Sequence, residues 1–184
     1  MEVKKLGVLG CGQMGAGIVQ VFAQAGYEVI AVDTVPTMLE KGLKGIDKRL
    51  AGRVEKGNLS EDEKKAIMGR IKTSSKLQDL ADCDLVEEAA PEDLELKKKT
   101  FAQLDKICKP ETIFGTNTSG LSVTDMAVAT KRGDKLLGMH FHNPAPVMQL
   151  LELVRTIMTS QETIDTVKKW GKTLGKTVVV APDV

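Results

Sequence analysis

The chain has 184 residues, 42% hydrophobic and 28% charged, which is typical of one soluble globular domain. Its 26 Lys and Arg residues almost balance its 25 Asp and Glu residues, and only 3% of residues are aromatic, which argues against a basic nucleic-acid groove or a base-stacking surface. No apolar run approaches about 18 residues, no apolar signal region opens the chain, and the three scattered cysteines suggest neither a disulfide framework nor a metal cluster. We therefore expect a cytoplasmic protein with no membrane partner, no nucleic-acid partner and no metal.

Strand-like and helix-like segments alternate along the chain. In chain order we expect a strand at 3–9, a helix at 14–25, a strand at 27–32, a helix at 36–56, a helix that begins after the capping-box pattern at 60–63, strands at 71–74 and 85–89, a helix at 91–109, a strand at 113–116, a short helix at 122–130, strands at 136–140 and 150–154, a helix at 163–174 and a strand at 177–180. This alternation predicts the α/β class, with a doubly wound, mostly parallel sheet and helices on both faces.

Ligands of such sheets bind outside the carboxyl ends of the strands. Five segments with glycine or polar residues directly follow expected strands: residues 10–15, Asp33, residues 89–92, residues 116–119 and residues 140–144. The candidate site is therefore expected where these five segments meet.

The glycine-rich segment fits the dinucleotide-binding pattern G-x-G-x-x-G of Rossmann-type folds. Gly10 allows a tight turn, Gly12 lets a pyrophosphate approach the backbone, and Gly15 lets the helix pack closely on the strand. Asp33 ends the next expected strand and can accept hydrogen bonds from both ribose hydroxyls of NAD, whereas it would repel the 2′-phosphate of NADP. NAD is therefore the expected cofactor, and the alternative is a glycine turn without a ligand.

The two histidines of the chain stand close together, at His140 and His142. Histidine is the natural acid or base near neutral pH. Glu152 lies in the next expected strand, and a proline loop between the strands could bring it beside His140, where it would orient the imidazole. The alternative is that His140 is a structural residue.

Three further segments have both a chemical and a structural interpretation. The polar loop at 116–120 offers hydroxyls and an amide to a carbonyl or a nicotinamide, or it caps the next helix. Glu87, Glu88 and Glu92 could do acid–base work, although Glu92 also suits a helix N-terminus. The basic run at 41–65 could bind a phosphorylated substrate tail, or it is a solvated helix face.

Together these segments resemble the NAD-binding domain of the 3-hydroxyacyl-CoA dehydrogenases, especially the bacterial 3-hydroxybutyryl-CoA dehydrogenase branch. The resemblance covers essentially all 184 residues, and its motifs are GCGQMGAGI at 10–18, Asp33, VEEAAPEDLELK at 86–97, NTSGL at 117–121 and HFHNPAPVMQLLE at 140–152. The last motif is the most specific. The chain departs from the usual pattern at His142, where Phe is usual, and at Gln149, where Lys is common. These departures bear on substrate detail rather than on the class of reaction.

The resemblance implies a reversible, NAD-dependent oxidation of an (S)-3-hydroxyacyl-CoA, such as 3-hydroxybutyryl-CoA, to the 3-ketoacyl-CoA, in fatty acid and butanoate metabolism. It implies that His140 is the catalytic base, that Glu152 is its partner, and that Ser119 and Asn143 complete the catalytic group, with Ser119 on the substrate's C3 oxygen. The implied cofactor-binding residues are Gly10, Gly12, Gln13, Met14, Gly15, Asp33, Ala89, Glu92, Lys97, Asn117, Ser119 and Asn143. Besides Ser119, the implied substrate-binding residues are those that would meet the coenzyme A phosphates: Lys56, Arg49 and Arg53.

The resemblance also implies that residues 1–184 form the NAD-binding domain, and that the family's C-terminal helical domain is absent from this chain. That helical domain supplies much of a dimer interface, so the full-length protein is expected to be a homodimer and the isolated domain to be weakly active or inactive. Two alternatives remain open: a 3-hydroxyacid dehydrogenase of the hydroxyisobutyrate type, and an NAD-binding module without turnover.

Overall fold

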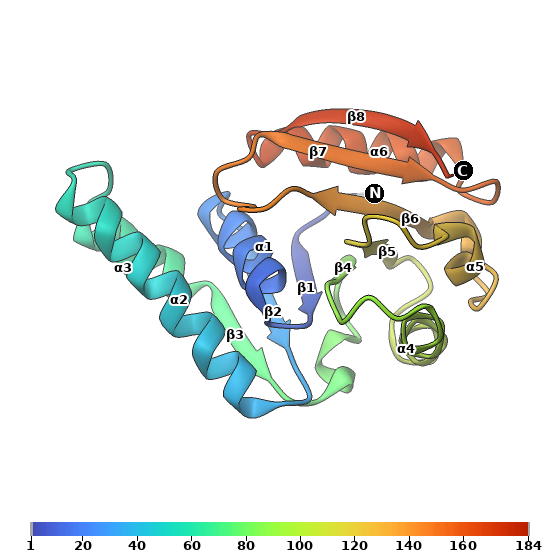
Figure 1. Ribbon diagram of the computed structural model, residues 1–184, viewed down its shortest axis with the longest axis horizontal. Coiled ribbons are helices and arrows are strands. Elements are labelled where there is room, and N and C mark those ends of the chain that lie inside the picture. The colour runs from blue at the N-terminus through green and yellow to red at the C-terminus, as the bar shows by residue number, and fades with distance from the viewer. Residues whose placement is uncertain (1, 184) are drawn as a thin grey trace.

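An eight-stranded sheet with the order β3-β2-β1-β4-β5-β6-β7-β8 organises the computed structural model, which describes residues 2–183 (Figure 1). The strands are β1 (Lys5–Leu9), β2 (Glu28–Val32), β3 (Ile71–Ser74), β4 (Leu85–Glu88), β5 (Ile113–Thr116), β6 (Leu136–Phe141), β7 (Leu150–Arg155) and β8 (Thr177–Pro182). All neighbours pair in parallel except β6 and β7, which are antiparallel. The expected doubly wound, mostly parallel sheet is confirmed.

Helices cover both faces of this sheet. They are α1 (Gln13–Gln24), α2 (Pro36–Glu55), α3 (Glu61–Gly69), α4 (Leu94–Ile107), α5 (Val123–Ala127) and α6 (Gln161–Thr173), with short 3-10 turns η1 (Leu77–Leu80) and η2 (Gly133–Lys135). One buried cluster joins α1, α2 and α6 to the sheet and includes Ile18, Ile46, Val167, Val8 and Met139. A second cluster joins α4, α5 and η1 to the opposite face and includes Phe101, Met126, Leu80, Val86 and Phe114.

Strand positions follow the expectations closely, whereas helix starts depend on capping side chains. We expected a helix from Pro91, but α4 begins at Leu94 because the Asp93 side chain caps it, accepting a hydrogen bond from the Leu96 N–H at 2.9 Å. We expected a helix from Thr163, but α6 begins at Gln161 because Ser160 caps it. The capping box at the start of α3 is present as expected. The two 3-10 turns were not anticipated.

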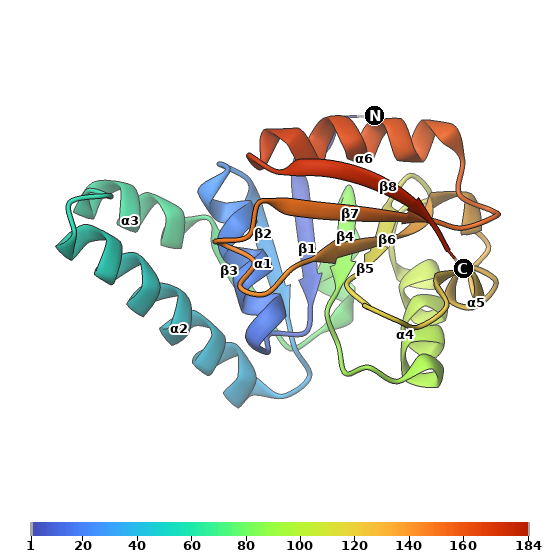
Figure 2. The same ribbon diagram turned by 45° about the horizontal axis from the view of Figure 1, so that its top comes forward.

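The helical pair α2–α3 projects away from the sheet, while the remaining helices lie against it (Figure 2). Helix α2 starts close to the carboxyl end of β2 and runs for 20 residues, which is roughly 30 Å. Its charged far half is therefore distant from the strand ends. Within the described residues, no helix is long and apolar enough to cross a membrane.

Candidate active site

Three cavities follow one another where the parallel strands end at their carboxyl side. The first has a volume of about 600 Å³ and is lined by the glycine loop from Gly10 and by Ala90. The second, of about 380 Å³, shares Ala90 with the first and extends to Ser119 and His140. The third, of about 190 Å³, shares Ser119 and His140 with the second and reaches Glu152. The cavities thus form a continuous row from the glycine loop to the histidine–glutamate pair.

The glycine loop has the close contacts that its sequence pattern predicts. Gly10 has a φ of +96°, and a side chain there would approach the Ala89 carbonyl oxygen to 2.6 Å. A Cβ at Gly15 would lie 1.8 Å from the Gly10 carbonyl oxygen, so only glycine lets α1 pack this close to β1. At Gly12 a Cβ would meet only the Met38 Cε, at 3.9 Å, so the backbone at the start of α1 is open to a ligand.

Asp33 holds the glycine loop in place. One carboxylate oxygen accepts a hydrogen bond from the Cys11 N–H at 2.8 Å, and the other accepts one from the Val35 N–H at 2.9 Å. A carboxylate has about four acceptor positions, so lone pairs remain for a ligand in the first cavity, which Asp33 lines. Burial, and secondarily the Asp33 charge, raise the pKa of the Cys11 thiol to about 11.

A buried ion pair supports the boundary between the first two cavities. The Lys97 ammonium lies 2.7 Å and 2.9 Å from the two carboxylate oxygens of Glu88, and both side chains are at most 1% exposed. Glu88 also accepts hydrogen bonds from the Thr116 hydroxyl at 2.7 Å and the Ala90 N–H at 2.6 Å. Lys97, expected as a cofactor contact, lines the second cavity while its charge is held by Glu88 and, at 3.6 Å, by Glu92.

The NTSG loop is tied to Glu92. The Thr118 hydroxyl donates to the Glu92 carboxylate, and the Ser119 N–H donates to the same oxygen at 3.3 Å. Ser119 itself is exposed and lines both the second and third cavities. Sequence reasoning missed Thr118, although its place within the expected polar loop was the available signal. The expected alternative, in which this segment caps the next helix, is also observed. Ser122 caps α5 by accepting a hydrogen bond from the Asp125 N–H at 3.2 Å.

His140 and Glu152 face each other across the antiparallel pair β6–β7. They are direct partners in the register, and the His140 Nδ1 lies 3.1 Å from a Glu152 oxygen. The two side chains are 19% and 33% exposed, so a ligand in the adjoining cavities can reach them. The expectation that the proline loop brings Glu152 beside His140 is confirmed.

Two asparagines connect this pair to the cofactor side. The Asn117 side-chain oxygen accepts a hydrogen bond from the Phe141 N–H at 2.8 Å, which ties the loop after β5 to the end of β6. Asn143 is exposed, and its side-chain oxygen accepts a long hydrogen bond from the Gln13 amide at 3.4 Å. Both asparagines line the second cavity.

His142 lies just beyond β6, as expected, and its ring packs against His140 with a centroid distance of 4.3 Å. Within the described residues, its buried Nε2 has no hydrogen-bond partner. Sequence reasoning gave this residue no role, and the available signal was its position two residues after His140.

The adjacent glutamates of β4 have opposite environments because side chains alternate along a strand. Glu88 is paired, whereas both oxygens of the fully buried Glu87 lack a hydrogen-bond partner among residues 2–183. Glu87 packs over Gly115 on β5, toward Met139 on β6. Burial, reinforced by the Glu88 charge, raises the pKa of Glu87 well above its ordinary value.

The basic residues of α2 lie apart from the three cavities and line none of them. The Arg49 guanidinium donates to the Gln20 side-chain oxygen at 2.6 Å, and its partial burial lowers its pKa. Arg53 makes one long hydrogen bond, 3.5 Å, to the Asn58 carbonyl oxygen. Lys56 is exposed at the end of the helix.

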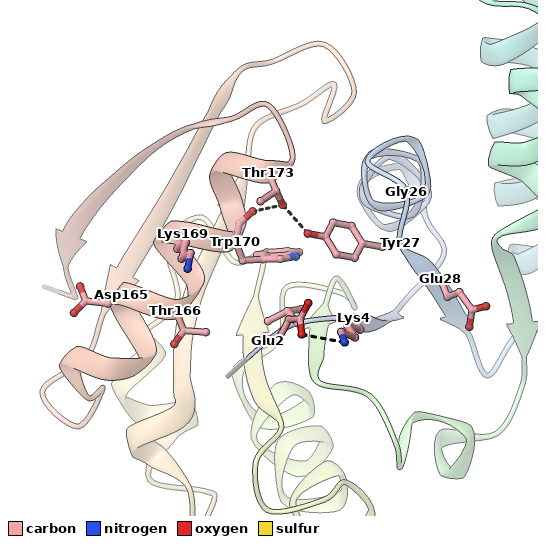
Figure 3. A pocket seen from close by; sticks show the side chains of 11 residues that line it. Glu2, Lys4, Gly26, Tyr27, Glu28, Asp165, Thr166, Lys169, Trp170 and Thr173 are labelled. Carbon is pink, nitrogen blue, oxygen red and sulfur yellow. Dashed lines mark hydrogen bonds and ion pairs between the residues drawn. The ribbon is translucent and has the colours of Figure 1, made fainter.

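A larger cavity, about 820 Å³, lies at the opposite edge of the sheet (Figure 3). There Tyr27, which precedes β2, and Trp170 of α6 approach each other, and the Tyr27 hydroxyl lies 2.7 Å from the Thr173 hydroxyl. None of the candidate site residues lines this cavity, so its size does not indicate the functional site.

Comparison with known proteins agrees with this geometry. The family described as "3-hydroxyacyl-CoA dehydrogenase, NAD binding domain" matches residues 5–184. The chain belongs to this family. NAD is accordingly the cofactor of this domain.

Relatives and solved structures match over the whole chain. The chain is 43% identical over 183 residues to a probable 3-hydroxybutyryl-CoA dehydrogenase of Bacillus subtilis, and 44% identical over 181 residues to a 3-hydroxybutyryl-CoA dehydrogenase of Bradyrhizobium diazoefficiens. These matches cover 100% and 98% of this chain, but only 64% and 62% of the two relatives. The crystal structure of 3-hydroxybutyryl-CoA dehydrogenase from Escherichia coli superposes with a TM-score of 0.98 at 38% identity, covering 100% of this chain and 39% of that one.

Proposed function

We propose that this 3-hydroxyacyl-CoA dehydrogenase domain takes part in the reversible, NAD-dependent oxidation of an (S)-3-hydroxyacyl-CoA, such as 3-hydroxybutyryl-CoA, to the 3-ketoacyl-CoA. The observation that carries the proposal is the 3.1 Å contact between His140 and Glu152 at the end of a row of cavities that begins at the glycine loop. A base oriented by a carboxylate, next to a dinucleotide site, suits the oxidation of a hydroxyl group.

The first cavity and the glycine loop suit the dinucleotide. Gly10 and Gly15 have no room for a side chain, and the open backbone at Gly12 leaves the N–H groups of the first turn of α1 free to receive a pyrophosphate. Asp33, at the same cavity, would accept hydrogen bonds from a ribose. The further residues that we assign to cofactor binding are Gln13, Met14, Ala89, Glu92, Lys97, Asn117, Ser119 and Asn143.

The proton transfer is assigned to His140. Because Nδ1 faces Glu152, Nε2 is the ring atom left for the substrate hydroxyl, and it takes the hydroxyl proton during oxidation. The ring then carries a positive charge that the Glu152 carboxylate offsets, and this attraction grows as the proton moves, so it lowers the barrier rather than only favouring binding. NAD, when bound, supplies the acceptor for the hydride.

Ser119 and Asn143 are assigned to holding the substrate. Ser119 lines both the second and third cavities, so its hydroxyl suits a hydrogen bond to the C3 oxygen. For the coenzyme A phosphates, Lys56 and Arg53 have more freedom than Arg49, which is held by Gln20.

The test is NADH oxidation by this chain with acetoacetyl-CoA, compared with free acetoacetate at equal concentration. Turnover of the thioester alone would support the proposal, whereas turnover of the free acid would favour the hydroxyisobutyrate type. NADH binding with no turnover of either substrate, by this chain and also by a chain extended with the family's C-terminal helical domain, would favour a binding module. The matched variant is His140→Gln, which should bind NADH as tightly as the wild type and lose turnover by orders of magnitude; retained turnover would contradict the assignment.

The assignment of Asp33 has its own test. Asp33→Ala should reduce the preference for NADH over NADPH, because it removes a carboxylate that repels a 2′-phosphate. Since Asp33 also accepts hydrogen bonds from the Cys11 and Val35 N–H groups, the variant should bind NADH more weakly as well. Unchanged selectivity between the two cofactors would argue against this role.

A further inference from the structure

Three metal-ligating side chains cluster at the end of the row of cavities, and the dehydrogenase reaction uses only two of them, His140 and Glu152. His140, His142 and Glu152 each offer a ligand atom, and these three atoms all lie within 4.8 Å of one another. His140 and Glu152 are already in contact at 3.1 Å, and the two imidazole rings are 4.3 Å apart. Two imidazoles and one carboxylate, with water as a fourth ligand, are a donor set that zinc uses in proteins.

The dimensions of the cluster fit such an ion after small side-chain rotations. Zinc lies about 2.0–2.2 Å from nitrogen and oxygen ligands, so tetrahedral ligand atoms are roughly 3.4 Å apart. The His140–Glu152 separation is already shorter than this, and the His142 ligand atom, within 4.8 Å of the other two, needs to move by at most about 1.4 Å. All three side chains are partly exposed, and the cavity of about 190 Å³ at His140 and Glu152 gives an ion access.

Among the described residues, one ring nitrogen of His142 is unpaired. Its Nε2 is buried without a hydrogen-bond partner in the part of the chain that the structure describes, although buried polar atoms are normally satisfied. Competing soft ligands are few, because the sequence has only these two histidines and all three cysteines are buried. Burial raises the pKa of the Cys11 thiol to about 11, which disfavours the thiolate that would bind a metal.

We propose that His140, His142 and Glu152 form a binding site for Zn²⁺, and that zinc bound there blocks the dehydrogenase. The ion takes a lone pair of His140 and replaces the hydrogen bond between His140 and Glu152, so the imidazole can no longer act as the base. This inference departs from our expectation that the chain holds no metal. Its inhibitory consequence rests on the proposed function, whereas the binding does not.

The binding is tested by titrating Zn²⁺ into the nucleotide-free chain in a calorimeter, with Mg²⁺ as the control ion. One Zn²⁺ should bind per chain and Mg²⁺ should not, because Mg²⁺ prefers oxygen ligands to imidazole. His142→Phe keeps a ring beside His140 and removes one ligand, and Glu152→Gln keeps the shape and removes the carboxylate. Each should weaken zinc binding at least about tenfold, since even the loss of an outer-shell partner weakens metal sites by 10–100-fold.

The matched control is Glu162→Gln, which removes an exposed carboxylate of α6 away from the cluster and should bind zinc like the wild type. Zinc should also raise the unfolding temperature of the wild type and the control more than that of His142→Phe. Equal zinc affinity in the wild type and both cluster variants would overturn the site, as would an absence of zinc binding to the wild type. If one cluster variant fails to fold, the other still decides the question.

The inhibition is tested separately, by comparing each protein's rate of NADH oxidation with and without zinc. The wild type and Glu162→Gln should be inhibited at the concentrations at which zinc binds, and His142→Phe should require at least about tenfold more zinc. Zinc binding to the cluster without inhibition would overturn the blocking role. A chain that binds zinc as expected but turns over neither substrate, even when extended with the family's C-terminal helical domain, would refute the proposed function and leave the site standing.

Discussion

The buried carboxyl of Glu87 should make the stability of this domain fall as pH rises. Glu87 sits in the central strand β4 with both oxygens unpaired among the described residues, over Gly115 and beside Met139. Burial, and secondarily the Glu88 charge, raise the pKa of Glu87 well above its ordinary value. Folding therefore favours the protonated form, while the unfolded chain releases this proton above a pH of about 4.3.

The sign and size of the effect follow from proton linkage. Below a pH of about 4.3 both states hold the proton, and Glu87 adds no pH dependence. Above that pH the folded state holds more protons than the unfolded state, so the free energy of unfolding falls by about 1.4 kcal/mol per pH unit until the pH reaches the raised pKa. Up to about pH 7 this loss is at most roughly 3.7 kcal/mol, a large part of a typical domain's stability.

Two variants separate the charge from the unpaired polar atoms. Glu87→Gln keeps the shape and removes the titration, so its advantage over the wild type should grow with pH at up to about 1.4 kcal/mol per unit. Glu87→Met also removes the unpaired oxygens, so it should add a further gain of about 1–3 kcal/mol at every pH. Urea unfolding between about pH 5 and pH 8, followed by the fluorescence of the single Trp170, measures both effects. If the Glu87→Gln and wild-type stabilities stay parallel across this range, the reasoning is wrong.

Three further predictions concern the buried ion pair, the glycine loop and the buried cysteines. Lys97→Met should destabilise the domain by about 3–5 kcal/mol in urea unfolding, because it leaves the buried Glu88 carboxylate without its ion-pair partner; a loss under 1 kcal/mol would contradict this. Gly15→Ala should abolish NADH binding in calorimetry, because a Cβ would lie 1.8 Å from the Gly10 carbonyl oxygen; wild-type affinity would show that the loop tolerates a side chain. The three cysteine thiols should resist alkylation at about pH 8 until urea is added, because burial raises their pKa values to about 11 or 12. Rapid labelling of the folded chain would contradict that burial.

The positions of strands and of the site segments could be predicted because they depend on local patterns. A run of apolar residues that ends in glycine, as at Gly10, indicates a buried strand and a turn whatever the rest of the chain does. The rule that ligands bind at the carboxyl ends of parallel strands then brings distant segments to one edge. The row of cavities from the glycine loop to Glu152 follows from these two facts.

Helix starts were less predictable because a single side chain decides them. Pro91 suits the start of a helix, yet Asp93 caps α4, which begins at Leu94, three residues later than expected. Ser160 likewise extends α6 by two residues. Both segments offer more than one residue that can begin a helix, and the sequence pattern does not say which one is used.

The fold class, the dinucleotide loop and the histidine–glutamate pair could be inferred from the sequence, because each depends on spacing along one or two segments. Which charges are paired could be read only from the packed structure. Glu87 and Glu88 are neighbours in the chain, but the pleat of β4 turns them to opposite faces, where Glu88 meets Lys97 and Glu87 meets no partner in residues 2–183. Such an ion pair forms only when side chains from different elements pack within a few ångströms of each other. The free energy of burying a charge depends on whether that partner is present.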